Sequence, residues 1–429
     1  MQFTETVDAA EFGRWLRLGL GRAVLYLQSH DSKPYRGALL DACLNDLSYD
    51  AQAGDDRAPY LYDLIQASGE LPLYRDHVIS SLQTSRGDSS ERQIFALARR
   101  LAQAGDASAK QIIYEAFAQN AAQQHYAGAS ELIALDGVDG FIFVAQHLTS
   151  LDPEEDDWLP SAWIDDLEER DGKEAAWSAL DRASGSVPEI APLLDLVKRE
   201  RAASSPLNRS PQPPVDYPTL RAEIERKGER TNGLWAWGKA AADESIAEAA
   251  RDLNMEQDRG RLLAYMKVFS RRAFPLEPDR LLELAQSEDK MLAWRTCHVL
   301  EIVAHPKVRE LAVKFAEMGS YTEATMLLKA NAQDGDAKRI LSWLELTADA
   351  DDLHVLAMTA RGFAEANWTE ESADCLFYMY ERGPCPMCRC SCVEMLDKRG
   401  LVPAWMRKEC CWDAEDELRK WAAGESETR

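Results

Sequence analysis

The sequence lacks both an excess of positive charge and any long apolar run. Its 429 residues include 49 Lys and Arg against 73 Asp and Glu, a formal net charge of −24. Nucleic-acid binding draws most of its affinity from cationic side chains on phosphates, and anionic membranes repel an acidic chain in the same way. No apolar run approaches the ~20 residues that cross a bilayer, and the first residues show no secretion signal. We therefore expect a cytoplasmic protein that contacts no membrane and for which a nucleic-acid partner is disfavoured.

Common catalytic signatures are also missing from the sequence. It contains no GxSxG, P-loop, HExxH or dinucleotide-binding fingerprint. His298 follows Cys297 directly, and adjacent helical residues diverge by about 100°, so this pair does not form a nucleophile and its base. The other histidines are isolated and are expected to be surface or core residues: His30, His77, His125, His147, His305 and His354. The sequence therefore predicts a non-catalytic protein.

Strand-type alternation of β-branched residues is scarce, whereas apolar residues recur at spacings of three and four along the chain. This pattern predicts an all-α fold. Residues 12–27 read as one helix, and its Gly19 and Gly21 suggest that a neighbouring helix approaches closely. Residues 202–218 are rich in Pro and Ser and predict a linker. We expect it to separate an N-terminal helical domain, 1–201, from a second domain, 219–429.

Negative charge is concentrated in the first of these domains. Residues 131–200 carry eighteen acidic and five basic side chains, about half of the excess negative charge. Within the acidic stretch 151–172, Trp158 and Trp163 lie among carboxylates that include Asp156 and Asp157. Tryptophans among acidic groups could anchor a basic protein partner. The alternative is a solvated loop with its tryptophans packed beneath it.

A second polar group surrounds the predicted loop near residue 50. Asp50, Arg57, Tyr60 and Asp63 stand close together in sequence. Binding residues often gather on loops that rigid helices support. The group is therefore either a ligand site or a buried network in which Arg57 pairs with Asp50 or Asp63.

Seven of the nine cysteines lie between Cys375 and Cys411. If a helix begins at Pro386, Cys385, Cys388 and Cys392 share one face, and Cys410 could approach from the next helix. Four thiolates at tetrahedral distance would bind a structural zinc ion. Two alternatives stay open: cysteines can pack as small apolar residues in a core, or the pair at the helix amino terminus can be redox-active.

Within residues 278–423, Asp289 precedes Arg295 by six residues, and Asp413 precedes Arg419 by six. Prolines stand near predicted helix starts at positions 278, 306 and 403. This plan resembles HEAT repeats. The resemblance implies antiparallel helix pairs stacked into an α-solenoid, in which a turn Asp caps the second helix and the Arg pairs with a neighbouring repeat.

HEAT-like proteins mostly act as protein-interaction scaffolds, and some relatives are alkylpurine DNA glycosylases. The resemblance therefore implies a scaffold first and a glycosylase-type enzyme second.

Overall fold

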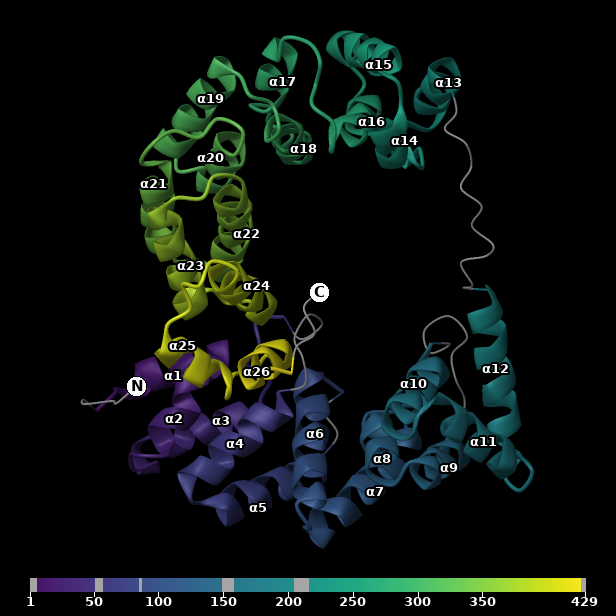
Figure 1. The fold of residues 1–429 in the computed structure, drawn as a ribbon. Coiled ribbons are helices and arrows are strands. Elements are labelled where there is room, and N and C mark those ends of the chain that lie inside the picture. Colours follow the sequence, from purple (N-terminus) through teal and green to yellow (C-terminus); the bar gives the residue numbers. More distant parts are fainter. Residues whose placement is uncertain (1–5, 51–56, 85–86, 149–157, 204–215, 426–429) are drawn as a thin grey trace. The chain divides into compact units, whose positions relative to one another are not determined.

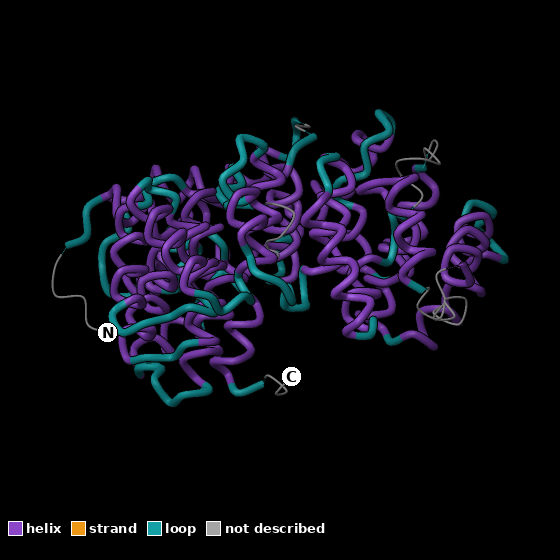
Figure 2. The backbone as a smooth tube through the Cα atoms, turned by 90° about the horizontal axis from the view of Figure 1, so that it is seen from above, coloured by secondary structure: helices purple, strands orange, loops and turns teal. Residues whose placement is uncertain are grey.

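The computed structural model describes residues 6–50, 57–84, 87–148, 158–203 and 216–425, and helices are the only regular elements within them (Figure 2). The predicted all-α class is confirmed. None of the helices described is both long and apolar enough to cross a membrane. The chain forms two compact units. Unit 1 comprises residues 1–210, 385–387 and 402–429, and unit 2 comprises 211–384 and 388–401.

Unit 1 is built from the first twelve α-helices and the last two (Figure 1). Their bounds are α1 Ala9–Leu18, α2 Arg22–Leu27, α3 Arg36–Leu44, α4 Ala58–Ser68, α5 Leu71–Ser81, α6 Ser89–Gln103, α7 Ala107–Ala121, α8 Ala129–Asp136, α9 Val138–His147, α10 Leu159–Asp171, α11 Lys173–Ser184, α12 Ile190–Ala203, α25 Ala404–Cys410 and α26 Asp416–Ala423. A 3-10 turn, η1 Lys33–Tyr35, precedes α3.

Unit 2 holds the remaining helices, except for the first two residues of α24, which belong to unit 1. Their bounds are α13 Tyr217–Lys227, α14 Leu234–Ala240, α15 Asp243–Met255, α16 Arg259–Phe269, α17 Asp279–Leu284, α18 Lys290–Leu300, α19 Pro306–Glu317, α20 Tyr321–Leu328, α21 Asp336–Leu346, α22 Ala350–Ala366, α23 Glu370–Arg382 and α24 Pro386–Asp397, with a 3-10 turn, η3 Gly228–Arg230, after α13.

In both units a helix packs against the helix two positions further along the chain. In unit 1 the even-numbered helices contact one another in order from α2 to α12. In unit 2, α14, α16, α18, α20 and α22 form a similar row (Figure 1). Each helix buries one apolar stripe against such neighbours. This pattern is compatible with a helical repeat.

Polar links in unit 2 recur at nearly constant sequence separation. Lys307 Nζ lies 2.6 Å from Asp279 Oδ1 and Lys329 Nζ lies 3.5 Å from Glu301 Oε1, and both pairs are 28 residues apart. The pair of Arg309 with the fully buried Asp336 spans 27 residues. These links join α17 to α19, the end of α18 to the end of α20, and α19 to α21.

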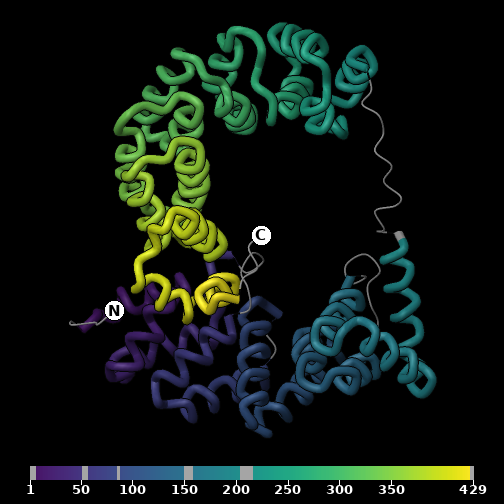
Figure 3. Tube along the Cα trace, viewed as in Figure 1, coloured from purple at the N-terminus to yellow at the C-terminus, as the bar shows by residue number. Residues whose placement is uncertain are grey.

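The C-terminal helices belong to unit 1, where they lie beside the N-terminal helices (Figure 3). Arg22 Nε is 2.8 Å from Glu409 Oε1, and both side chains are buried. Arg419 Nη2 is 2.9 Å from Asp63 Oδ2 on α4. The helix pair at the chain's end thus completes the packing of α2 and α4.

The helix predicted over residues 12–27 is divided into α1 and α2. Gly19 ends α1 in the left-handed conformation, with φ 70°. Gly21 allows the close approach that its presence suggests, because a Cβ there would lie 2.1 Å from the Glu409 carbonyl oxygen. The glycines therefore have separate roles, one in ending a helix and one in packing.

Candidate functional site

A groove of about 610 Å³ lies over α14, α16 and α18 in unit 2. Trp235 and Trp294 contribute aromatic surface, and Lys267, Arg295 and His298 contribute basic groups. Trp235 is 45% exposed, which is unusual for so large an apolar side chain. None of the described residues that line the groove is acidic. The groove therefore combines aromatic surface with positive charge in a chain of net charge −24.

The basic groups of the groove are positioned by neighbouring side chains and backbone. Lys267 Nζ donates to the Glu229 carbonyl oxygen at 2.6 Å. The Arg295 guanidinium lies 5.0 Å from the ring centroid of Trp294. His298 packs edge-on against the same ring at 4.1 Å, and its Nδ1 lies 3.5 Å from Glu301 Oε2. Arg295 is exposed, so its charge faces solvent.

Close packing brings together α14 and α16, two of the helices that line the groove. A Cβ at Gly238 would lie 2.0 Å from the Val268 carbonyl oxygen, so only glycine allows this approach. Trp235 precedes Gly238 by three residues and therefore lies almost one turn away. The short helix is thus fixed where its tryptophan borders the groove.

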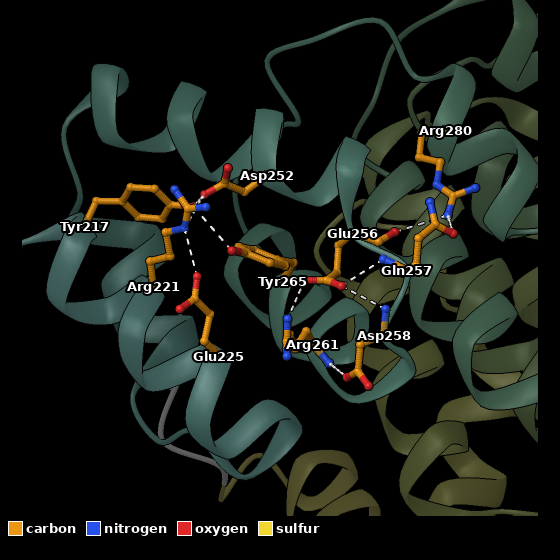
Figure 4. Close-up of polar contacts among 10 residues, drawn as sticks. All are labelled: Tyr217, Arg221, Glu225, Asp252, Glu256, Gln257, Asp258, Arg261, Tyr265 and Arg280. Atoms are coloured by element: carbon orange, nitrogen blue, oxygen red, sulfur yellow. Dashed lines mark hydrogen bonds and ion pairs between the residues drawn. The ribbon is translucent and has the colours of Figure 1, made fainter.

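A buried polar network fixes the other side of α16 (Figure 4). Tyr217 on α13 donates to Asp252 Oδ2 on α15 at 2.5 Å and lies 3.4 Å from the Tyr265 hydroxyl on α16. Burial raises the pKa of Tyr217, and its bonds to Asp252 and Tyr265 raise it further. Tyr217 therefore stays a neutral donor. Arg221 adds an ion pair to Asp252 at 3.3 Å.

The start of α16 is fixed by a capping residue. The Asp258 side chain accepts from the Arg261 N–H at 3.0 Å, which satisfies a free amide of the first turn (Figure 4). Arg280 donates to the Glu256 carbonyl oxygen at 3.3 Å and so ties this turn to α17.

A second constellation contains cysteine and histidine at the start of α24. Cys388 Sγ lies 3.4 Å from Nε2 of His354 on α22. Cys385 directly precedes α24, so the covalent chain places it one helical turn before Cys388. Cys385 is buried, and the other two are partly exposed.

The four cysteines predicted to bind zinc are divided between the two units: Cys385 and Cys410 belong to unit 1, and Cys388 and Cys392 belong to unit 2. Cys388 comes together with His354, a residue that sequence spacing marked as isolated. Cys392 and Cys410 are buried. No sequence signal links His354 to Cys388, because the two residues are 34 positions apart.

The buried cysteines elsewhere have a different character. Burial raises the pKa of Cys43 and of Cys375 to about 12, so both stay neutral thiols. Cys375 Sγ donates to the Ala337 carbonyl oxygen at 3.4 Å. These two residues pack as core.

The two tryptophans of the acidic stretch differ in exposure. Trp158 is 56% exposed. Trp163 is 2% exposed and packs edge-on against Tyr126 at 6.2 Å, so it cannot meet a partner directly. Asp156 and Asp157 lie outside the described residues.

The loop group near residue 50 has partners other than those weighed from the sequence. Arg57 donates to carbonyl oxygens at the end of α1, at 3.2 Å for Arg17, and its guanidinium lies 5.8 Å from the Tyr60 ring. The Tyr60 hydroxyl donates to the Leu20 carbonyl oxygen at 3.2 Å. Asp63 pairs with Arg419, and Asp50 is exposed. These contacts join the start of α4 to α1.

The two Asp and Arg pairs that suggested a repeat make different contacts in the structure. Asp289 accepts from the Leu292 N–H at 3.1 Å and so caps α18 as expected, but its ion-pair partner is Arg259. Arg419 donates to the Asp413 backbone carbonyl at 2.5 Å.

Comparison with known proteins adds no relative: no family model, no curated protein and no solved structure matches the chain. Function must therefore be inferred from the residues themselves.

Proposed function

We propose that the protein is a non-catalytic scaffold of HEAT-like helical repeats that binds an acidic peptide segment of a partner protein in the groove over α14, α16 and α18. The row from α14 to α22 and the links at 27 and 28 residues support a repeat architecture. Such rows expose a continuous surface to a partner.

The aromatic and basic lining of the groove is the observation that carries the proposal. Tryptophan and arginine dominate the binding energy of protein interfaces, and Trp235, Trp294 and Arg295 all border this groove. Its lining carries no acidic group among the described residues, which favours a negatively charged occupant. A short acidic segment suits the groove better than a long polyanion, because the chain's overall charge of −24 repels the latter.

A peptide-binding measurement tests the proposal. The probes are a labelled acidic peptide with a central aromatic residue and a matched peptide in which every acid is replaced by lysine. We expect the full chain to bind the acidic peptide and to ignore the basic one, with affinity falling as salt rises. Preference for the basic peptide would contradict the proposed charge complementarity.

Groove variants locate the binding. Trp235→Ala should cost about 2 kcal/mol or more, roughly a thirtyfold loss of affinity, if Trp235 is an anchor. Trp158→Ala is the matched control, because Trp158 is an exposed tryptophan in unit 1. An equal effect of both substitutions would place binding outside the groove.

The same test also examines two functions that the sequence predicts, binding of a basic partner and a glycosylase-type activity. A basic partner bound through the acidic stretch would appear as binding of the basic peptide that Trp158→Ala reduces. A glycosylase-type activity would require duplex DNA to compete with the acidic peptide at low salt, and such competition would count against the scaffold.

A further inference from the structure

Two arginines of unit 2 lie over the tryptophans of the groove. The guanidinium carbon of Arg271, just after the end of α16, is 4.8 Å from the ring centroid of Trp235. Arg295 on α18 lies over Trp294 at 5.0 Å. Both arginines are exposed. Each tryptophan of the groove therefore has a cationic group beside it.

These two arginines differ from others in unit 2 in their partners. Several arginines there pair with carboxylates: Arg221 with Asp252, Arg259 with Asp289, and Arg309 with Asp336. Among the residues that the structure describes, neither Arg271 nor Arg295 has an ion pair or a hydrogen bond to a carboxylate. Attraction to a ring uses the charge of the guanidinium group and not its N–H donors. Those donors are therefore available to a ligand.

Lys267 adds a third positive charge to the groove. Its Nζ donates one hydrogen bond, to the Glu229 carbonyl oxygen, and an ammonium group has further protons to donate. A single carboxylate offers these cations one charge and two oxygens. A phosphate monoester carries about −1.5 to −2 charge at neutral pH and three strong acceptor oxygens. The phosphate therefore matches the basic groups of the groove better.

We infer that the acidic group recognised by the groove is a phosphate monoester, carried by a phosphoserine or phosphothreonine of the partner peptide. This inference rests on the proposed function, because it names the chemistry of the occupant of that groove. A guanidinium group binds phosphate through two parallel N–H donors, a geometry that an ammonium group cannot supply. One phosphate also concentrates its charge beside the arginines, whereas a run of carboxylates would spread it toward a chain of net charge −24.

A set of matched peptides tests the inference. The parent is the acidic peptide with a central aromatic residue, and in each member of the set one acid is replaced by phosphoserine. We expect the full chain to bind at least one phosphopeptide about tenfold or more tightly than the parent, which corresponds to one added charge-assisted hydrogen bond. If the parent binds and no phosphopeptide exceeds it, the inference is overturned while the proposed function stands. If neither kind of peptide binds, the proposed function fails as well.

A nucleotide could present the same phosphate chemistry beside an aromatic ring. Adenosine monophosphate is therefore added as a competitor of the tightest phosphopeptide. We expect it to compete only weakly, because it has no peptide chain to follow the groove. Tighter binding of the nucleotide than of every phosphopeptide would overturn the assignment of a peptide.

Substitutions that keep the charge identify the binding residues. Arg271→Lys and Arg295→Lys remove the planar guanidinium group, so together they should lower the ratio of phosphopeptide to parent affinity by at least about fivefold. Arg251→Lys is the matched control, because Arg251 is exposed on α15 and does not line the groove. Far-ultraviolet circular dichroism verifies that each variant stays helical. An unchanged ratio in the double variant, or an equal fall in Arg251→Lys, would refute the assignment.

Discussion

Glu91 is a buried carboxylate that three donors surround. It accepts from the Gly87 N–H at 2.7 Å and from Asn120 Nδ2 at 2.8 Å, and His125 Nε2 lies 2.8 Å away. Burial alone raises the pKa of Glu91, but these bonds outweigh it, and the pKa falls below its ordinary value. The side chain is therefore ionised in the folded protein, although it is only 4% exposed.

Replacement of this carboxylate should remove a pH-dependent part of the stability of unit 1. A lowered folded pKa stabilises the protein above the unfolded value of about 4.3, and this stabilisation is lost as the pH falls through the folded pKa. Glu91→Gln should therefore reduce the free energy of unfolding by about 1–3 kcal/mol at neutral pH. Urea unfolding at neutral and at acid pH measures the difference between wild type and variant.

The control for this measurement is Glu115→Gln, because Glu115 is exposed on α7. It should leave the stability nearly unchanged at both pH values. A difference for Glu91→Gln that does not shrink in acid would contradict the role given to its charge.

At the scale of the element, a single close approach positions α14. Gly238 packs on the Val268 carbonyl of α16, and both helices line the groove. A methyl group at Gly238 must push the two helices apart, because it would meet the backbone carbonyl oxygen of Val268, which cannot rotate away as a side chain can.

Gly238→Ala should destabilise the protein by about 1–3 kcal/mol through overpacking and should weaken peptide binding in the groove. Gly37→Ala provides the control, since a Cβ at Gly37 in α3 meets nothing within 4 Å. That variant should be neutral or stabilised by up to about 1 kcal/mol. Thermal unfolding of the two variants compares them, and equal effects would argue against a tight helix contact.

The helices could be predicted from the sequence, because the apolar spacing that indicates a helix lies within a short stretch of chain. The helices that pack against each of them could not be predicted in this way. Apolar spacing of three and four indicates two helices joined by a tight turn within residues 402–423, but it does not say which helices cover their apolar stripes. Cys388 and His354 are 34 positions apart in the sequence, so only the fold could bring their side chains together. The groove also depends on tertiary packing, because Trp235 and Trp294 lie on different helices.

At the scale of the whole molecule, unit 1 contains residues from both ends of the chain. The C-terminal segment supplies Glu409 to the buried Arg22 and Arg419 to Asp63. Unit 2 is therefore an insertion within the sequence of unit 1.

A chain that ends at Leu401 should have a destabilised unit 1. Loss of Glu409 leaves the Arg22 charge without this partner, and breaking a buried pair costs about 3–5 kcal/mol. Hydrogen exchange should speed up in α2 and α4, while α16 and α18 serve as an internal reference in unit 2. A chain that ends at Glu425 is the control, and unchanged protection of α2 in the shorter chain would disprove the dependence.

The pair of Arg22 with Glu409 also bears on how the protein is made. The two residues are 387 positions apart, and at about 5–20 residues per second the ribosome needs roughly 20–80 s to pass from one to the other. During this interval the Gly21 surface of α2 has no final partner, although α1 to α12 have already been synthesised. Helix α2 is thus made well before α25, and a chaperone that shields α2 until α25 has been made would favour correct assembly.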